Sequence, residues 1–232
     1  LAPETQLPDI IEDVEDAFDW LHKNSLEKFG ASSDRIAVAG GSAGGYLTLT
    51  AGYRARPRPT VLVSFWGYGD LVGSWYSTPS PHPRHHQSTM SEEEARAQVA
   101  GPPISDSRNR KGNGGAFYQF CRQTGRWPLE VSGWDPARQP RKFYPYMPVK
   151  NVDRHYPPTM LIHGTNDTDA EVEVVHHEVE RASVDEVLER RLWRGRPRPV
   201  VVAVPDYTHV GVHLEHQAAV DSAHACASRC VV

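Results

Sequence analysis

Four short runs of apolar residues, separated by long polar stretches, predict the strands of a sheet. They cover residues 35–39, 60–65, 159–163 and 200–204. The last run, Val200–Val204, is an almost unbroken series of β-branched residues, which is typical of a strand buried in a parallel sheet. The pattern therefore predicts an α/β fold with a mostly parallel sheet flanked by helices.

Several of the remaining segments have apolar residues at helical spacing or helix-capping signals, which predict helices. Between residues 10 and 21 apolar positions recur at helical spacing, with acidic residues on the other face, Pro8 in the first turn, and Gly30 ending a further short helical turn. Ser91 and Glu94 form a capping box that opens a short helix closed by Gly101. Further helices are predicted over residues 115–124, with Gly125 after them, over 171–191, and at the chain end from about residue 210.

The middle of the chain has a different composition. From residue 66 to about 153, prolines, glycines and aromatic residues dominate and no further parallel-strand run occurs. We expect one domain, with a core of residues 1–65 and 154–232 and a cap inserted at about 66–153. Five aromatic side chains form either the core of this cap or an apolar wall for an acyl group: Trp127, Trp134, Phe143, Tyr144 and Tyr146.

A glycine-rich turn joins the first predicted strand to a helix. The sequence GGSAGG contains the pattern G-x-S-x-G, in which a nucleophilic serine, here Ser42, is held on a sharp strand-to-helix turn. Such a turn crowds its neighbours, so residues without a β-carbon are favoured on both sides, here Gly40, Gly41, Gly44 and Gly45. At the helix N-terminus, the Ala43 N–H is placed to stabilise an oxyanion. Neither a P-loop nor a dinucleotide fingerprint is present.

An acidic residue follows the third predicted strand. The strand ends in HGTND, and Asp167 lies just beyond its carboxyl end, where open α/β sheets place their active sites. We predict Asp167 as the acid of a catalytic triad. Asp169 is the second candidate, with a helix-capping role as its alternative, and Asp70 is the third.

A histidine follows the fourth predicted strand. His209 lies in the loop after it and is predicted to accept the serine proton while the acid orients the ring. His213 competes for this role, although a surface position on the last helix suits it better, and His163 suits a structural role. His82, His85 and His86 form a cluster in which we favour a solvated loop over a metal site.

The composition narrows the function classes. The chain has 232 residues and a net charge of −4, so its charge does not indicate nucleic-acid binding. No apolar stretch is long enough to span a membrane. Cys121, Cys226 and Cys230 do not form a disulfide framework, so we expect reduced thiols and a cytoplasmic protein. No metal or cofactor is implied.

The chain resembles α/β-hydrolases of the esterase and lipase kind over almost its whole length. GGSAGG is close to the GDSAGG of hormone-sensitive-lipase-like carboxylesterases, and the segment Leu1–Glu4, Pro8 and Glu12–Asp13 is similar to the one that precedes their nucleophile. HGTND looks more like the acid motif of prolyl-oligopeptidase-type hydrolases. The resemblance implies Ser42 as nucleophile, Asp167 as acid and His209 as base.

The chain departs from this family in three places. Thr208 and Val210 flank His209 where a small residue or glycine is usual, and the stretch between acid and histidine is long, with residues 189–196 as extra material. The HGGG-type loop that supplies the second oxyanion donor is absent, and the first methionine is Met90. We therefore expect an N-terminally incomplete sequence whose first strands and loop lie upstream of Leu1. Loss of one oxyanion donor costs about 3 kcal/mol of transition-state stabilisation, which predicts little esterase activity for the chain alone.

These observations predict a serine hydrolase that cleaves small carboxylic esters through an acyl-enzyme. One alternative is a serine peptidase of the prolyl-oligopeptidase type, which HGTND favours. The other is a non-catalytic or degenerate protein with the same fold, which the surroundings of His209 and the absent loop favour.

Overall fold

The computed structural model describes residues 2–102, 109, 112, 114–164 and 167–169, and the backbone of residues 200–204. Over these residues the chain forms two compact units. The sheet unit consists of the described residues of 14–69 and 152–232, and the helical unit consists of those of 1–13 and 70–151. Whether residues 66–153 are a cap inserted into one hydrolase domain stays a prediction.

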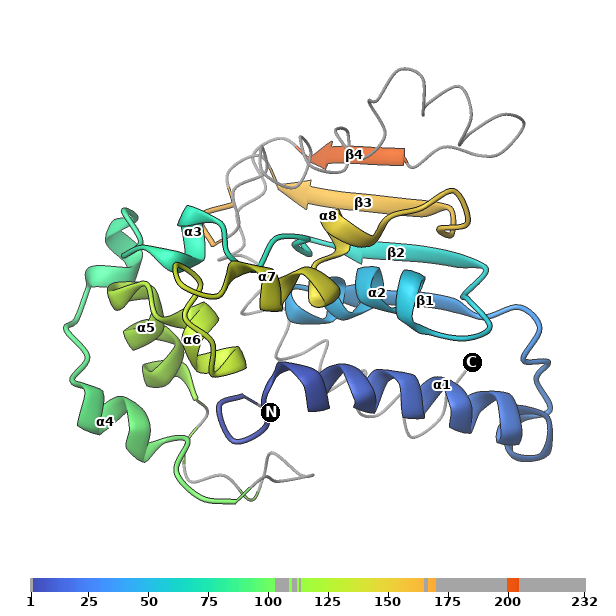
Figure 1. Cartoon of the computed structure of the whole chain (residues 1–232), viewed down its shortest axis with the longest axis horizontal. Helices are drawn as coiled ribbons and strands as arrows, with labels where there is room; N and C mark the ends of the chain where they lie inside the picture. The colour runs from blue at the N-terminus through green and yellow to red at the C-terminus, as the bar shows by residue number, and fades with distance from the viewer. Residues whose placement is uncertain are drawn as a thin grey trace. The chain divides into compact units, whose positions relative to one another are not determined.

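Over the described residues the sheet has four parallel strands, in the order of the sequence (Figure 1). They are β1 (Ala37–Gly41), β2 (Val61–Phe65), β3 (Thr159–Gly164) and β4 (Val200–Val204). Gly41 pairs with Phe65, Phe65 with Ile162, and Ile162 with Val202, so the carboxyl ends of the strands are aligned. The predicted fold class and the four predicted strands are confirmed, although β1 begins and ends two residues later than predicted, so that Gly40 and Gly41 belong to the strand. The residues that directly follow each strand therefore begin at the same end of the sheet, the one formed by the carboxyl ends of the strands.

Helix α2 (Ala43–Arg54) packs on β1 and β2. Ala51 of this helix and Ala55, which caps its C-terminus, form a buried cluster with Phe18, while Tyr53, Leu62 and Tyr156 form a second one. The hydroxyl of Tyr156 donates a hydrogen bond to the Leu49 carbonyl oxygen over 2.5 Å, and burial raises the pKa of this tyrosine. These contacts hold the helix, and with it the turn that precedes it, against the sheet.

Helix α1 (Leu7–Phe29) is longer than the periodicity indicated. Pro8 lies in its first turn, as predicted. The prediction of a separate short helical turn before Gly30 was wrong, because one helix continues to Phe29. No glycine or proline interrupts residues 9–29, so nothing breaks the helix before Gly30, which adopts a left-handed conformation at φ 65°. In the sheet unit, Val14 and Phe18 of α1 pack against Ala51 and Ala55.

The helical unit contains only short helices after α1 over the part of the chain that is described. They are α3 (Ser74–Ser77), η1 (Pro83–His86), α4 (Glu92–Ala97), α5 (Gly115–Thr124), α6 (Trp127–Ser132), α7 (Pro140–Phe143), η3 (Tyr144–Tyr146) and α8 (Pro148–Asn151). Helix α5 has the predicted bounds, with Gly125 in a left-handed conformation after it. Its residues Phe117, Phe120 and Cys121 pack with Ala95 and Val99.

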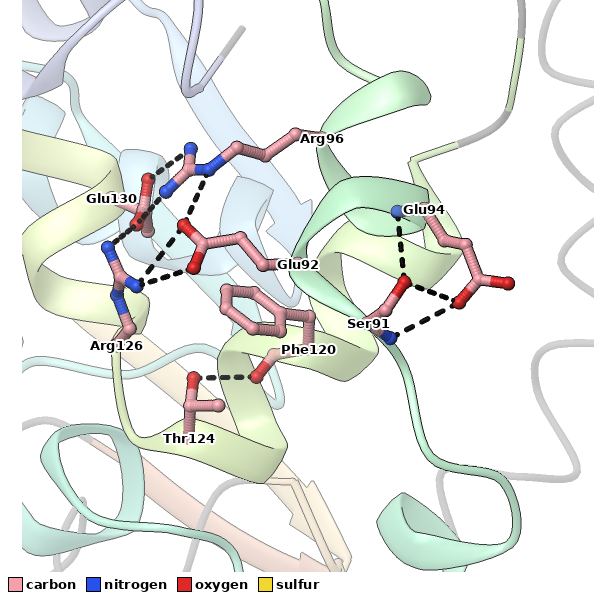
Figure 2. Close-up of polar contacts among 8 residues, drawn as sticks. All are labelled: Ser91, Glu92, Glu94, Arg96, Phe120, Thr124, Arg126 and Glu130. Atoms are coloured by element: carbon pink, nitrogen blue, oxygen red, sulfur yellow. Dashed lines mark hydrogen bonds and ion pairs between the residues drawn. The ribbon is translucent and has the colours of Figure 1, made fainter.

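The capping box that opens α4 is confirmed (Figure 2). The Ser91 hydroxyl oxygen accepts the Glu94 N–H over 3.2 Å, and a carboxylate oxygen of Glu94 accepts the Ser91 N–H over 3.2 Å. The predicted end of the helix at Gly101 is wrong, because α4 ends at Ala97. There the N–H groups of Gln98 and Val99 donate to the carbonyl oxygens of Ala95 and Arg96, three residues back, so the last turn tightens and the α-helix stops before Gly101.

Four of the five aromatic residues singled out in the predicted cap pack against other rings within the helical unit, whereas Tyr144 is exposed. Phe143 is fully buried, and the Trp134 ring lies edge-on to it with ring centroids 5.5 Å apart. Trp127 stacks on Tyr76 with centroids 4.2 Å apart. These rings thus contribute to the core of their own unit. The predicted helices at 171–191 and at the chain end, and Cys226 and Cys230, lie outside the described residues.

Candidate active site

Ser42 lies on a one-residue turn between β1 and α2. Strand β1 ends at Gly41 and the helix begins at Ala43, so Ser42 alone reverses the chain, with φ 54° and ψ −120°. A positive φ is uncommon for any residue other than glycine. Two hydrogen bonds hold the turn: the Ser42 N–H donates to the Phe65 carbonyl oxygen and the Ser42 carbonyl oxygen accepts the Tyr46 N–H, both over 3.0 Å. Ser42 is half-buried. The structure thus has the strand–turn–helix geometry that a nucleophilic serine requires.

The glycines around Ser42 are not equivalent. A β-carbon at Gly40 would overlap the backbone carbonyl of Gly44, and one at Gly45 would come within 2.7 Å of the Gly67 α-carbon. At Gly41 a β-carbon would lie 3.0 Å from the indole of Trp66. A β-carbon at Gly44 would meet nothing within 4 Å. Close approach therefore explains three of the four predicted elbow glycines, and Gly44 has no such requirement.

The first turn of α2 is fixed against the residues that follow β2. The rings of Tyr46 and Tyr68 are stacked, with centroids 5.3 Å apart and planes inclined by 4°. Both side chains are buried, and burial raises the pKa of Tyr68. Ala43, which follows Ser42, is exposed, and its N–H belongs to the first turn of the helix, where backbone donors have no acceptor within the helix. The position fits the predicted oxyanion donor.

Asp167 lies three residues beyond β3 and is held by its own loop. Its N–H donates to the Gly164 carbonyl oxygen over 3.1 Å, and its Oδ1 accepts the N–H of Asp169 over 2.8 Å. Its Oδ2 lies 3.2 Å from Nε2 of His163, and the two side chains are only 4% and 2% exposed. The carboxylate is therefore fixed in place, and His163 is one of the groups that fix it.

His163 is the site residue whose contact the sequence analysis missed. The prediction of a structural role left its partner unnamed. The signal was present in the spacing, since His163 and Asp167 are four residues apart across the end of a strand. A strand that passes into a tight loop can bring such residues together, but spacing alone does not show the direction of either side chain.

Ser42 and Asp167 both follow the carboxyl ends of strands, at the same end of the sheet. Ser42 follows β1 directly, Asp167 follows β3, and β2 lies between these strands. His209 and its competitor His213 lie outside the described residues. The structure therefore places the predicted nucleophile and acid after the carboxyl ends of strands in the same sheet. The identity of the base stays a prediction.

The two competing acids have local hydrogen bonds of their own. Asp169 is buried, and its N–H supports Asp167. Asp70 belongs to the helical unit, where its Oδ1 accepts the Val72 N–H over 2.8 Å and closes a turn. Asp70 thus closes a local turn, and the choice of Asp167 over Asp169 and Asp70 as the acid stays a prediction.

The prediction of a solvated loop for the histidine cluster is wrong at His85. This side chain is buried, and its Nδ1 lies 2.6 Å from the Ser80 hydroxyl oxygen. The guanidinium of Arg84 donates to Nε2 over 3.1 Å, so Nε2 is an acceptor and Nδ1 carries the proton. His82 is half-buried and His86 exposed. Among the described residues no three His, Cys, Asp or Glu side chains are grouped to hold a metal ion.

No helix in the described part of the chain combines the length and apolar character needed to cross a bilayer.

Comparison with known proteins assigns the family. Residues 1–186 match the family described as having the α/β-hydrolase fold. The chain is 43% identical over 58 residues to the carboxylic ester hydrolase LipN of Mycobacterium tuberculosis, a match that covers 25% of this chain and 15% of LipN. It is 29% identical over 181 residues to the esterase LipC of the same organism, which covers 78% of this chain and 38% of LipC.

A solved structure with the same fold is a protein of unknown function from Staphylococcus aureus. It has a TM-score of 0.62 and 20% identity, and the match covers 90% of this chain and 66% of that one. The chain belongs to the α/β-hydrolase fold family and is an esterase- or lipase-like member of it. Its matches span well under half the length of the two mycobacterial esterases.

Proposed function

We propose that this chain carries the nucleophile and the acid of a serine hydrolase that cleaves carboxylic esters through an acyl-enzyme. The observation that supports it most strongly is the conformation of Ser42, which stands alone between strand and helix with a positive φ. Backbone strain of this kind costs about 1–3 kcal/mol and persists where a function or the surrounding packing requires it. The likeness to two esterases supports an ester as the substrate.

In the proposed mechanism Ser42 Oγ attacks the ester carbonyl carbon while His209 takes its proton. The Ala43 N–H stabilises the oxyanion of the tetrahedral intermediate, and Asp167 orients the imidazolium. The intermediate collapses, the bond to the alcohol oxygen breaks, and His209 returns the proton to the leaving alcohol. Water then attacks the acyl-enzyme by the same steps and releases the acid and Ser42.

Labelling by a fluorophosphonate tests the nucleophile and the base. We expect the probe to modify the full chain on Ser42, located by peptide mass spectrometry, and Ser42→Ala to remove the label. Ser32→Ala is the matched control, because Ser32 is an exposed serine that only contacts Asp34. His209→Ala should abolish labelling and His213→Ala should not. The reverse result would assign the base to His213, and a chain without labelling would be the degenerate protein of the alternative hypothesis.

Substrate preference separates the esterase from the peptidase. Both classes share the acyl-enzyme chemistry, so the nucleophile alone does not distinguish them. Because the HGGG-type loop that supplies the second oxyanion donor is absent from the sequence, we expect slow turnover of p-nitrophenyl acetate and of other aryl esters, but faster than turnover of amides. Faster turnover of prolyl or aminoacyl amides would instead support the prolyl-oligopeptidase-type activity.

A further inference from the structure

In the part of the chain that is described, two residues other than glycine have a positive φ, and they are neighbours in space. They are Ser42, at 54°, and Trp66, at 40°. Each directly follows a strand, β1 and β2, and the Ser42 N–H donates to the carbonyl oxygen of Phe65, which precedes Trp66. The proposed function explains the conformation of Ser42. It does not explain that of Trp66.

The conformation of Trp66 is unfavourable for its residue type. A positive φ is a genuine outlier for a bulky side chain and costs about 1–3 kcal/mol, whereas glycine adopts it freely. The backbone of Trp66 is nevertheless well held, because its N–H donates to the carbonyl oxygen of Ile162 in β3 over 2.6 Å. A large ring is thus kept on a backbone conformation that glycine would adopt at lower cost.

The Trp66 ring lies against the residue before Ser42. The three atoms nearest to a β-carbon added at Gly41 all belong to the indole: Cζ2 at 3.0 Å, Cε2 at 3.2 Å and Nε1 at 3.3 Å. Gly41 therefore leaves the space in which the indole is seated. Without the ring, two successive glycines, Gly40 and Gly41, would precede Ser42 with the wide conformational freedom of that residue type.

We propose that Trp66 is a positioning residue for Ser42, because its indole restrains Gly41 and so holds the turn that carries the hydroxyl. The proposal rests on the proposed function for its catalytic consequence. A displacement of about 1 Å at a reacting group can lower the rate about a hundredfold, so a loose turn would lower the rate of acylation more than it weakens substrate binding. The unfavourable backbone conformation of Trp66 is what places its indole against Gly41.

The test uses the full chain with Trp66→Gly and Trp66→Ala, which both remove the ring. Only Trp66→Gly also removes the backbone strain of the positive φ. In each variant we expect fluorophosphonate labelling of Ser42 and kcat for p-nitrophenyl acetate to fall about tenfold or more. KM should change less than about twofold, since the ring acts on the hydroxyl and not on binding. Trp66→Phe keeps a flat ring and should restore most of the rate.

A double-mutant cycle with Gly41 tests whether the effect passes through this contact. Gly41→Ala should lower labelling about tenfold in the parent chain, because the new methyl group meets the indole. In the Trp66→Gly chain the same change should cost less than about twofold, because the ring is gone. Effects that multiply independently, or a Trp66→Gly chain that labels at the parent rate, would overturn the proposal.

Amide hydrogen exchange gives a readout that does not depend on catalysis. Exchange over residues 40–46 should be about tenfold faster or more in Trp66→Gly and Trp66→Ala, while exchange over residues 16–29 of α1 stays unchanged. Unchanged exchange over 40–46 overturns the proposal whatever the labelling shows. If the parent chain never labels but exchange over 40–46 is still faster in the two variants than in the parent, the positioning by Trp66 is supported and the proposed function is contradicted.

Discussion

Nε2 of His163 lies 3.2 Å from Oδ2 of Asp167, in a pair that is almost fully buried. The two residues lie on either side of the end of β3, and the backbone N–H of Asp169 holds the other oxygen of the same carboxylate. The predicted acid is therefore fixed by its own strand and loop, which is what the orientation of a catalytic histidine requires.

Removal of the imidazole should destabilise the loop that carries Asp167. His163→Leu removes a partner of a buried carboxylate and should lower the free energy of unfolding by about 1–3 kcal/mol, measured by urea titration. His163→Gln can still present an N–H and should lose less. Equal losses in the two variants would show that volume, and not the polar contact, matters at this position.

Two glycines of the elbow should respond in opposite directions to the same substitution. Gly40→Ala places a methyl group against the Gly44 carbonyl and should lower the free energy of unfolding by about 1–3 kcal/mol. Gly44→Ala enters open space in the first turn of α2 and should raise it by about 0.4–1 kcal/mol, since alanine restricts the unfolded chain. Melting temperatures of the two variants provide the comparison. A loss at Gly44 comparable to that at Gly40 would contradict the described turn.

Stability of the sheet unit should depend on pH through Asp153. Both oxygens of this carboxylate accept hydrogen bonds from the Arg58 guanidinium, over 2.6 and 2.7 Å, and this contact lowers the pKa of Asp153 from 3.8 to about 2. Because the folded pKa lies below the unfolded one, the contribution is complete above about pH 4 and is lost as the pH falls toward 2.

The Asp153→Asn variant isolates this contribution. The carboxylate is 46% exposed, so solvent screening limits its value to less than about 1 kcal/mol at pH 7. Urea titrations between pH 7 and pH 2 should show the parent chain losing more stability than Asp153→Asn between pH 4 and pH 2. Parallel curves would show that the Arg58 contact adds nothing.

Glu130 should matter more than Glu92 to the ion-pair network that joins α4 to the start of α6. Figure 2 shows both carboxylates between Arg96 and Arg126, and one oxygen of Glu130 lies 2.9 Å from each guanidinium. The Glu130 side chain is 11% exposed and that of Glu92 49%. Glu130→Gln should lower the free energy of unfolding by about 1–3 kcal/mol. Glu92→Gln should cost less, and 1 M salt should remove that cost. Equal costs at both positions would contradict this ranking.

The elements carried by local signals were predictable from the sequence. Apolar runs gave the four strands, and Gly125 and the capping box at Ser91 gave the end of α5 and the start of α4. The turn at Ser42 was predictable because strand, glycines and helix follow one another directly.

Features that depend on contacts between distant segments were not predictable. Residues 1–13 and 70–151 form one compact unit although 56 residues separate them, and His85 is buried by contacts that a proline- and histidine-rich loop does not reveal. The positive φ of Trp66 arises where β2 leaves the sheet beside Gly41, a relation between strands that no local pattern encodes. The role of His209 stays a prediction.

An acid-quenched reaction of the full chain with p-nitrophenyl acetate tests the central claim most directly. Peptide mass spectrometry at times shorter than one turnover should find an acetyl group on Ser42, and Ser42→Ala should neither carry the group nor release p-nitrophenol above background. Release of p-nitrophenol at the parent rate from Ser42→Ala, or an acetyl group on a different residue as the reaction intermediate, would contradict the assignment of Ser42 as the nucleophile.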